Sequence, residues 1–102
     1  MNGARLINRT AAAIGTPDFS DHQKVDLSII SNKTTVLSRH EVYRIWSSVD
    51  CFVRLGDSTV TAATTDMPLT AKIDNYWTID LNFYIAAIVS AGTGALYITR
   101  VK

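Results

Sequence analysis

Apolar and polar residues alternate along much of the chain from Val25 onward, and a period of two residues is typical of β-strands that bury one face. The runs are short, and turn-forming Gly, Asp, Asn and Ser residues separate them, as in an all-β sandwich or barrel. The predicted strands are residues 25–29, 34–37, 42–46, 50–55, 59–64, 76–81, 84–90 and 95–101. We therefore expect an all-β fold, a small antiparallel β-sandwich of jelly-roll-like type over residues 25–102.

Residues 1–24 lack this period and mix small, polar and charged side chains. A segment without periodic apolar surface does not offset by itself the roughly 1–2 kcal/mol of backbone entropy lost per ordered residue. We expect residues 1–24 to form an extended N-terminal arm that is ordered mainly by what it touches. Its candidate contact residues are the larger apolar side chains Leu6, Ile7, Ile14 and Phe19.

The dipeptide Gly56-Asp57 separates two of the predicted strands and indicates a two-residue β-hairpin. Glycine tolerates the positive φ that the first position of a type II′ turn needs. With this turn Leu55 faces Ser58 and Val53 faces Val60, so the apolar residues of both strands share one side. A slip of one residue would break that agreement, and the register therefore supports the hairpin.

A second hairpin is predicted for the last two strands, with residues 91–94 as its loop. In this register Val89 faces Leu96 and Ala87 faces Ile98, and the opposite side of the strand pair is also apolar. Either an arm or loop of the fold covers that opposite side, or another protein chain does, since aromatic residues are enriched at such contacts. Both hold if the arm comes from a neighbouring subunit. The candidate interface residues on this side are Tyr84, Ile88, Tyr97 and Val101.

The same alternation assigns side chains to the core. Cys51 lies on an alternating strand with Val53, and a lone cysteine there is more often a small core residue than a nucleophile, which needs an electropositive, accessible setting. The expected inward residues are Leu27, Ile29, Cys51, Val53, Leu55, Val60, Trp77, Ile79, Leu81, Ala87, Val89, Leu96 and Ile98.

Length, charge and cysteine content restrict the class of protein. A chain of 102 residues is one domain on length alone, and so small a core gains from oligomerisation. The net charge of +1 argues against a nucleic-acid partner, which needs clustered positive charge, and gives little attraction to an anionic membrane. No apolar run approaches the roughly 20 residues of a membrane-spanning helix. The single cysteine fits assembly in a reducing compartment.

Side chains with catalytic or metal-binding chemistry are scattered. His22 and His40 are far apart, and neither has a partner at metal-ligand spacing. The aspartates near His22 lack the spacing and the turn glycine of a calcium loop, and aspartates elsewhere in the chain are common turn residues. No serine lies in a Gly-x-Ser-x-Gly motif. We therefore expect no enzymatic activity, no catalytic residue, no metal ligand and no cofactor.

Two aromatic side chains leave an alternative function open. Trp77 shares the inward face of its strand, but Trp46 and Tyr76 lie on strands where either packing or exposure is possible. Tryptophan in a small core is usually a packing residue. Exposed aromatic platforms bind sugar rings, so a small carbohydrate-binding β-sandwich module is the alternative to a structural protein.

Two segments of the chain suggest a family: VYRIWSSVDCFVRLGDSTVTAATTDMPLTA and YIAAIVSAGTGALYITRV. Residues 65–69, with the pattern T-D-M-P-L, follow a strand pair around a glycine turn, and residues 92–99, with the pattern G-T-G-x-L-x-I-T, form a closing strand. In these features residues 42–101 resemble small β-sandwich structural proteins of tailed bacteriophages. The arm takes no part in the resemblance.

The resemblance implies a non-enzymatic virion protein, a head decoration or cement protein. Proteins of that kind bind the outside of the assembled capsid as homodimers or homotrimers and clamp adjoining major capsid proteins. The expected partners are therefore the major capsid protein and other copies of this chain, with neither nucleic acid nor membrane. The expected location is the capsid exterior of the virion, after assembly in the host cytoplasm. A tail or fibre adaptor with the same sandwich fits the resemblance equally well.

Overall fold

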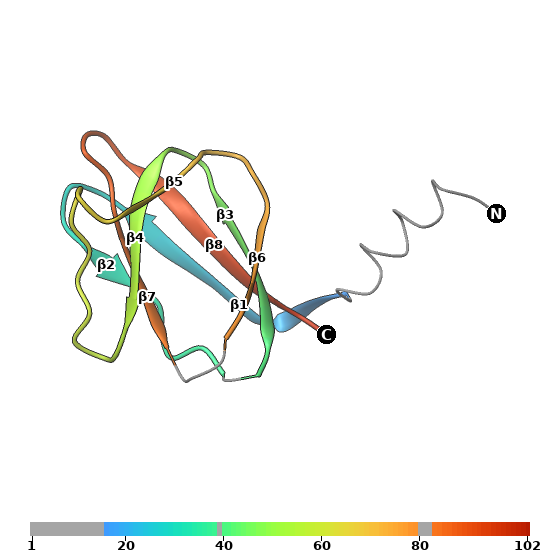
Figure 1. Ribbon diagram of the computed structural model, residues 1–102. Helices are drawn as coiled ribbons and strands as arrows, with labels where there is room; N and C mark the ends of the chain where they lie inside the picture. Colours follow the sequence, from blue (N-terminus) through green and yellow to red (C-terminus); the bar gives the residue numbers. More distant parts are fainter. Residues whose placement is uncertain (1–15, 39, 80–82) are drawn as a thin grey trace.

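The computed structural model describes residues 16–38, 40–79 and 83–102, and these form eight β-strands joined by turns and loops (Figure 1). Burial follows the period of two that the sequence predicts, most strictly in the third strand, where every second side chain is buried. The strands are β1 (Pro17–Leu27), β2 (Asn32–Lys33), β3 (Val42–Ser47), β4 (Cys51–Gly56), β5 (Met67–Leu69), β6 (Asn75–Thr78), β7 (Tyr84–Ile88) and β8 (Gly94–Val101).

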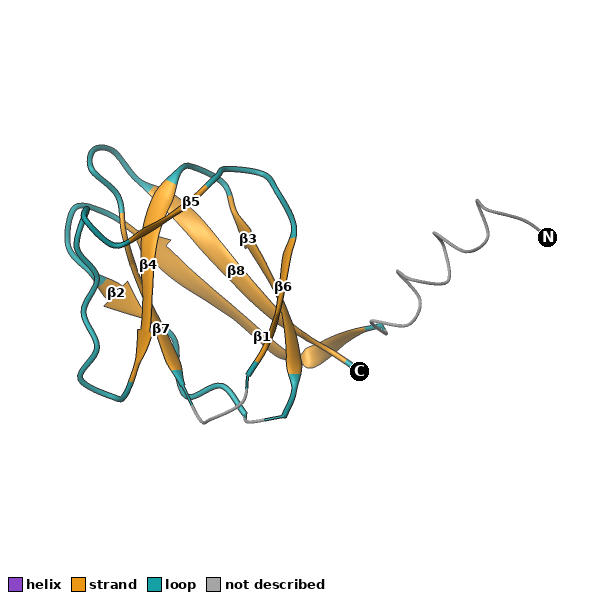
Figure 2. Cartoon of the chain, in the orientation of Figure 1, coloured by secondary structure: helices purple, strands orange, loops and turns teal. Residues whose placement is uncertain are grey.

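The strands form two antiparallel sheets of four strands each, shown as two layers in Figure 2. Sheet A has the order β1-β8-β3-β6 and sheet B the order β2-β7-β4-β5. Strand β1 therefore pairs with β8, β2 with β7, β3 with β6 and β4 with β5, as if one long hairpin had been rolled up. This is the strand order of a double-sheet jelly roll, so the predicted fold class is confirmed.

The core lies between the two sheets and receives large side chains from both. Sheet A contributes Tyr43 and Ile45 of β3 and Ile98 of β8, all at most 1% exposed. Burial in this core raises the pKa of the Cys51 thiol, which stays protonated and inaccessible at neutral pH. The prediction that Cys51 is a core residue is confirmed. The other expected inward residues that are buried are Leu27, Val53, Ile79, Ala87, Val89, Leu96 and Ile98.

Some expected inward residues are placed differently. Leu55 and Trp77 are partly buried and pack against the core from its margin. Val60 is also partly buried, but it lies in a loop. The prediction for Ile29 was wrong, because β1 ends at Leu27 and Ile29 follows in a turn, 65% exposed. Leu81 lies outside the described residues.

The hairpin predicted at Gly56-Asp57 is absent. Strand β4 ends at Gly56, and its partners are β7, which pairs Leu55 with Ile85, and β5, which pairs Cys51 with Leu69. Residues 59–64 offer one large apolar side chain, whereas pairing with β5 brings Leu69 into the core at 5% exposure. Greater apolar burial therefore favours the later segment over the nearer one.

The hairpin predicted between the last two strands is also absent, because β7 belongs to sheet B and β8 to sheet A. The intervening loop carries the chain across the sandwich, with Gly92 at a φ of +78°. The two strands face each other through the core instead of pairing edge to edge. Val89 and Leu96 are buried, as expected, but not as a hydrogen-bonded pair.

The sheet begins before Val25, where we expected the sandwich to start. Strand β1 extends back to Pro17, and His22 and Lys24 pair with Thr99 and Tyr97 of β8. Residues 17–24 of the expected arm are therefore part of sheet A. They show no clear strand period because one face of β1 is solvated and the register shifts within the strand. Residues 1–15 lie outside the described residues.

Candidate functional site

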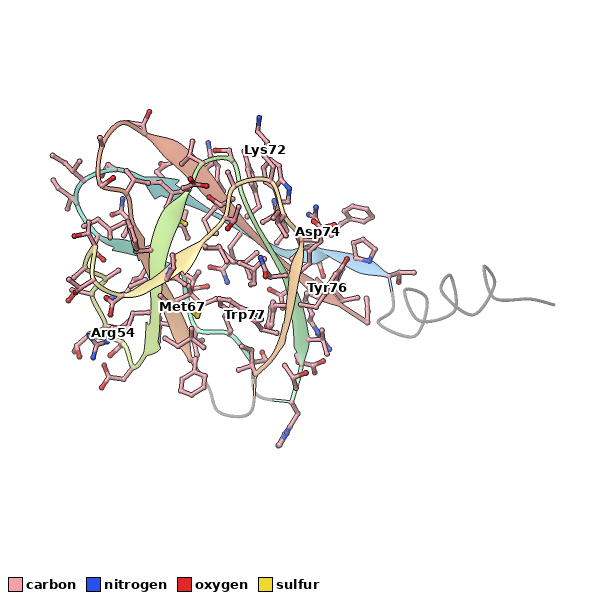
Figure 3. The ribbon with its side chains drawn as sticks, turned by 45° about the horizontal axis from the view of Figure 1, so that its top comes forward. Arg54, Met67, Lys72, Asp74, Tyr76 and Trp77 are labelled. Atoms are coloured by element: carbon pink, nitrogen blue, oxygen red, sulfur yellow. The ribbon has the colours of Figure 1, made fainter. Side chains whose placement is uncertain are left out.

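The outer face of sheet A carries a row of four side chains that crosses all four strands. In register, His22 of β1 is opposite Thr99 of β8, Thr99 is opposite Arg44 of β3, and Arg44 is opposite Tyr76 of β6. Arg44 Nη2 lies 2.6 Å from Asp74 Oδ1 in an ion pair. Figure 3 shows Asp74 and Tyr76 beside one another at the β6 edge. Residues on this face come from every strand of the sheet, so the fold and not the local sequence assembles them.

The aromatic rings of Tyr97 and Trp46 lie next to this row and pack against its His22 end. The rings of His22 and Tyr97 are stacked, with centroids 5.9 Å apart and planes at 19°, and Trp46 packs against Tyr97 at 5.8 Å and 45°. His22 Nδ1 is also 2.6 Å from Thr99 Oγ1, a hydrogen bond between the two side chains. Of the two aromatic residues noted in the sequence, Trp46 is half-buried and Tyr76 is 45% exposed.

A bulge in β1 borders the row. Pairing passes from Pro17 opposite Val101 to His22 opposite Thr99, so residues 18–21 of β1 are inserted against the single β8 residue Arg100. Bulges of this kind redirect side chains away from the regular pleat. Phe19, in the bulge, is 90% exposed.

The other conspicuous residue of the bulge is Asp18, whose side chain is 8% exposed between two cations near the end of the chain. Its Oδ2 is 3.7 Å from both Arg100 Nη1 and Lys102 Nζ. The hydroxyl and the amide of Ser20 both donate to Asp18 Oδ1, at 2.6 and 3.1 Å. These hydrogen bonds, followed by the attraction of Lys102 and Arg100, lower the pKa of the Asp18 carboxyl. The cluster joins the beginning of β1 to the end of β8.

The low pKa of Asp18 predicts a pH-dependent contribution to stability. A carboxyl whose pKa is lowered in the folded state stabilises the fold above its ordinary pKa of about 3.9, and that contribution is lost as the pH falls through the folded-state pKa. Urea midpoints of the wild type and Asp18→Asn should therefore differ near neutral pH and converge in acid. A gap that stays constant across this range would show that the carboxylate charge is not what stabilises the fold.

The open edge of the sandwich between β5 and β6 forms a groove of about 440 Å³ lined by Leu55, Met67, Tyr76, Trp77 and Thr78. In Figure 3 Met67 and Trp77 lie between the two strands, and Tyr76 lies on the other side of β6. Met67 is 49% exposed, so the apolar margin of the core reaches solvent here.

The five candidate interface residues that the structure describes do not gather on one surface. Leu6, Ile7 and Ile14 lie outside the described residues. Tyr84 and Ile88 lie half-buried on the outer face of sheet B, in register with Gly56 and Phe52 of β4. Tyr97 is on the outer face of sheet A, where Val101 is 7% exposed, and Phe19 projects from the bulge. The expected single apolar face depended on a hairpin that the fold does not contain.

Among the described residues, the most exposed pair of adjacent apolar side chains was not predicted from the sequence. Ile29 and Ile30, in the β1–β2 loop, are 65% and 72% exposed. The amide of Ile30 donates to Ser28 Oγ at 3.1 Å, and Asn32 Nδ2 donates to the Asp26 carbonyl at 2.9 Å. Ser28 and Asn32 are turn-forming residues on either side of the pair, and they were the available signal for a turn.

The described residues were compared with what a metal site and a membrane-spanning helix require. Within residues 16–38, 40–79 and 83–102, no group of three His, Cys, Asp or Glu side chains is placed to hold a metal ion. Asp66 accepts a hydrogen bond from the amide of Ala63 at 2.7 Å, the turn role expected for such aspartates. Among the described residues there is also no helix long and apolar enough to cross a membrane.

Comparison with known proteins gives no relative. No protein-family model, no curated protein and no solved structure matches the chain.

Proposed function

We propose that this chain is a non-enzymatic virion structural protein that binds the outside of a tailed-phage capsid and cements adjoining major capsid proteins. Two features support the proposal before any surface is considered. Residues 42–101 resemble small structural proteins of such phages, and the jelly roll is a fold that viral capsid proteins also use. Because one fold hosts many functions, the proposal depends on a particular surface.

The observation that carries the proposal is the display of Ile29 and Ile30 by an ordered turn. Ser28 Oγ both accepts from the Ile30 amide and donates to the Ile30 carbonyl, each at 3.1 Å. The amide of Ala62, from the β4–β5 loop, donates to Ser31 Oγ at 2.8 Å and ties the turn to sheet B. The two side chains contribute little to the core, and burial against a partner would gain about 1.5–3 kcal/mol for each.

Repetition on a symmetric particle would strengthen such a contact. A homodimer or homotrimer presents two or three copies of the Ile29–Ile30 turn, and linked contacts act together through their effective concentration. Leu6, Ile7 and Ile14 of the N-terminal segment are the further contacts that we propose. The partners are then the major capsid protein and other copies of this chain, on the capsid exterior after assembly in the host cytoplasm.

The proposal predicts that purified protein binds expanded phage heads saturably and that a double variant, Ile29→Ser with Ile30→Ser, binds at least about tenfold more weakly. Both side chains are exposed, so the variant should melt at the wild-type temperature. The matched control is Val36→Ser, which removes a 48% exposed apolar side chain from the β2–β3 connection.

Sedimentation of labelled protein with heads measures the affinity. The proposal fails if the wild type does not bind heads, or if the double variant binds as tightly as the wild type. Saturable binding to isolated tails, with none to heads, would instead identify a tail adaptor.

A further inference from the structure

The outer face of sheet A is hollowed beside the β1 bulge. The hollow has a volume of about 410 Å³ and is lined by Pro17, Phe19, His22, Arg44 and Thr99. It lies near the beginning of β1, whereas the Ile29–Ile30 turn follows the end of that strand. The two surfaces are therefore separate, and a ligand in the hollow would leave the turn free.

The hollow continues into a longer row across the sheet. His22, Thr99, Arg44 and Tyr76 are opposite one another on successive strands, and strands about 4.8 Å apart make this row about 14 Å long. Phe19, 90% exposed, stands at the β1 end, and Tyr76, 45% exposed, at the β6 end. Polar side chains between two exposed aromatic rings suit an extended ligand that is apolar on its faces and hydroxylated at its edges.

We propose that this row binds a neutral oligosaccharide of pyranose units. A pyranose has C–H faces that pack on aromatic rings, here Phe19 and Tyr76, and hydroxyls that both donate and accept hydrogen bonds. Arg44 supplies donors and Asp74 supplies acceptor oxygens, so the pair matches both functions of neighbouring hydroxyls. A few polar groups in a mostly apolar hollow are the usual composition of a small-ligand site.

The charge of the row favours a neutral sugar over an acidic one. Arg44 is the cation of the hollow, and Asp74, 2.6 Å away, balances it. An acidic sugar would have to compete with Asp74 for the guanidinium. A hydroxyl adds to the existing pair without displacing either member.

The polar groups are also held in place before a ligand arrives. His22 is fixed by its 2.6 Å hydrogen bond to Thr99 and by stacking on Tyr97, and Arg44 is fixed by Asp74. Side chains that are already ordered lose less conformational entropy on binding, which raises the affinity of a shallow site.

The test is an NMR titration of the full chain with hexasaccharides of glucose, of mannose and of galactose, and with a hexasaccharide of a uronic acid as the charged comparator. At least one neutral hexasaccharide should shift the amide signals of β1, β8, β3 and β6 along the row. Phe19→Ala and Tyr76→Ala should each weaken that binding by about tenfold, with unchanged melting temperature. Ile30→Ala, which removes another exposed apolar side chain, should leave it unchanged.

Three results would overturn the assignment. The first is no amide shift with any neutral hexasaccharide at about 10 mM, since a Kd above this concentration corresponds to less than about 3 kcal/mol of binding free energy. The others are binding that neither aromatic variant weakens and binding of the uronic acid hexasaccharide alone. If Phe19→Ala abolishes a dimer of the protein while no sugar binds, the face is a contact between two copies. Head binding through the Ile29–Ile30 turn can succeed or fail independently of these results.

Discussion

A chain that starts at Val25 is expected to lose at least about 3 kcal/mol of its free energy of unfolding, whereas a chain that starts at Thr16 should be as stable as the full-length protein. The first truncation removes the pairing of His22, Gln23 and Lys24 with β8. Each hydrogen bond that the truncation removes contributes about 0.5–1.5 kcal/mol to stability. Together these losses are a large part of the free energy of unfolding of a typical domain, which is about 5–15 kcal/mol.

That truncation also removes several specific side-chain interactions. Asp18 no longer lies beside Arg100, the hydrogen bond from the Tyr43 hydroxyl to Asp21 Oδ2 (3.2 Å) is broken, and the His22 ring no longer stacks on Tyr97. The truncation at Thr16 keeps all of them, because these interactions involve only residues from Asp18 onward.

Urea denaturation followed by tryptophan fluorescence compares the two truncated chains with the full-length protein. Equal midpoints for all three would show that residues 16–24 are an arm, as the sequence suggested, and not a strand that stabilises the sheet. If the chain that starts at Thr16 were unfolded, residues 1–15 would belong to the folded domain.

Replacing Gly94 with alanine is expected to destabilise the protein by about 2–3 kcal/mol, since overpacking a filled site forces side chains and backbone to move. A Cβ at Gly94 would lie 2.4 Å from Val49 Cγ2 and 3.1 Å from Ser48 Oγ. Val49 packs against the core, and Ser48 Oγ accepts a hydrogen bond from the Ala95 amide at 2.9 Å. Neither neighbour can move away without disrupting its own packing or hydrogen bond.

A double-mutant cycle separates this collision from a general effect of replacing a glycine. Val49→Ala removes both methyl groups that meet the new Cβ, so Gly94→Ala should cost at least about 1 kcal/mol less in that background. Gly92→Ala is the control: its φ of +78° strains alanine, but no atom lies within 4 Å, so Val49→Ala should not change its cost. Additive effects of Gly94→Ala and Val49→Ala would contradict the predicted collision.

The sequence was sufficient for most strands and, in β4 and β8, for which side of the strand is buried, but it left the buried side of β3 open. The predicted runs at residues 42–46, 50–55 and 95–101 correspond closely to β3, β4 and β8. Alternation records burial directly, because a residue on the core face must be apolar and its neighbours need not be. For this reason Val53, Leu96 and Ile98 were assigned correctly to the core.

The sequence was not sufficient for which strands are neighbours. A glycine-rich loop between two apolar strands permits either a hairpin in one sheet or a crossing between two sheets, and both bury the same residues. The predicted register, with Val53 opposite Val60, was therefore consistent with the apolar pattern, but it is not the register that forms. In the structure Val53 is opposite Met67 and Ala87. Strands that are close in the sequence are not necessarily paired in a fold in which β1 pairs with β8.

The same limit explains why the candidate surfaces were predicted only in part. The row on sheet A joins His22 to Thr99, which are 77 residues apart, so no local pattern contains it. Arg44 within an apolar run was the one local sign that the run has a solvated face. Ile29 continued the alternation of β1, but the turn formed by Ser28 ends the strand before it.

If the proposed function holds, this chain is part of a phage particle, and cryo-electron microscopy of that particle tests the central claim most directly. We predict a jelly roll on the outer surface of the head, in a copy number set by the capsid symmetry, with the Ile29–Ile30 turn against the major capsid protein. Finding the jelly roll in the tail, or finding the head surface occupied with that turn facing solvent, would contradict the account.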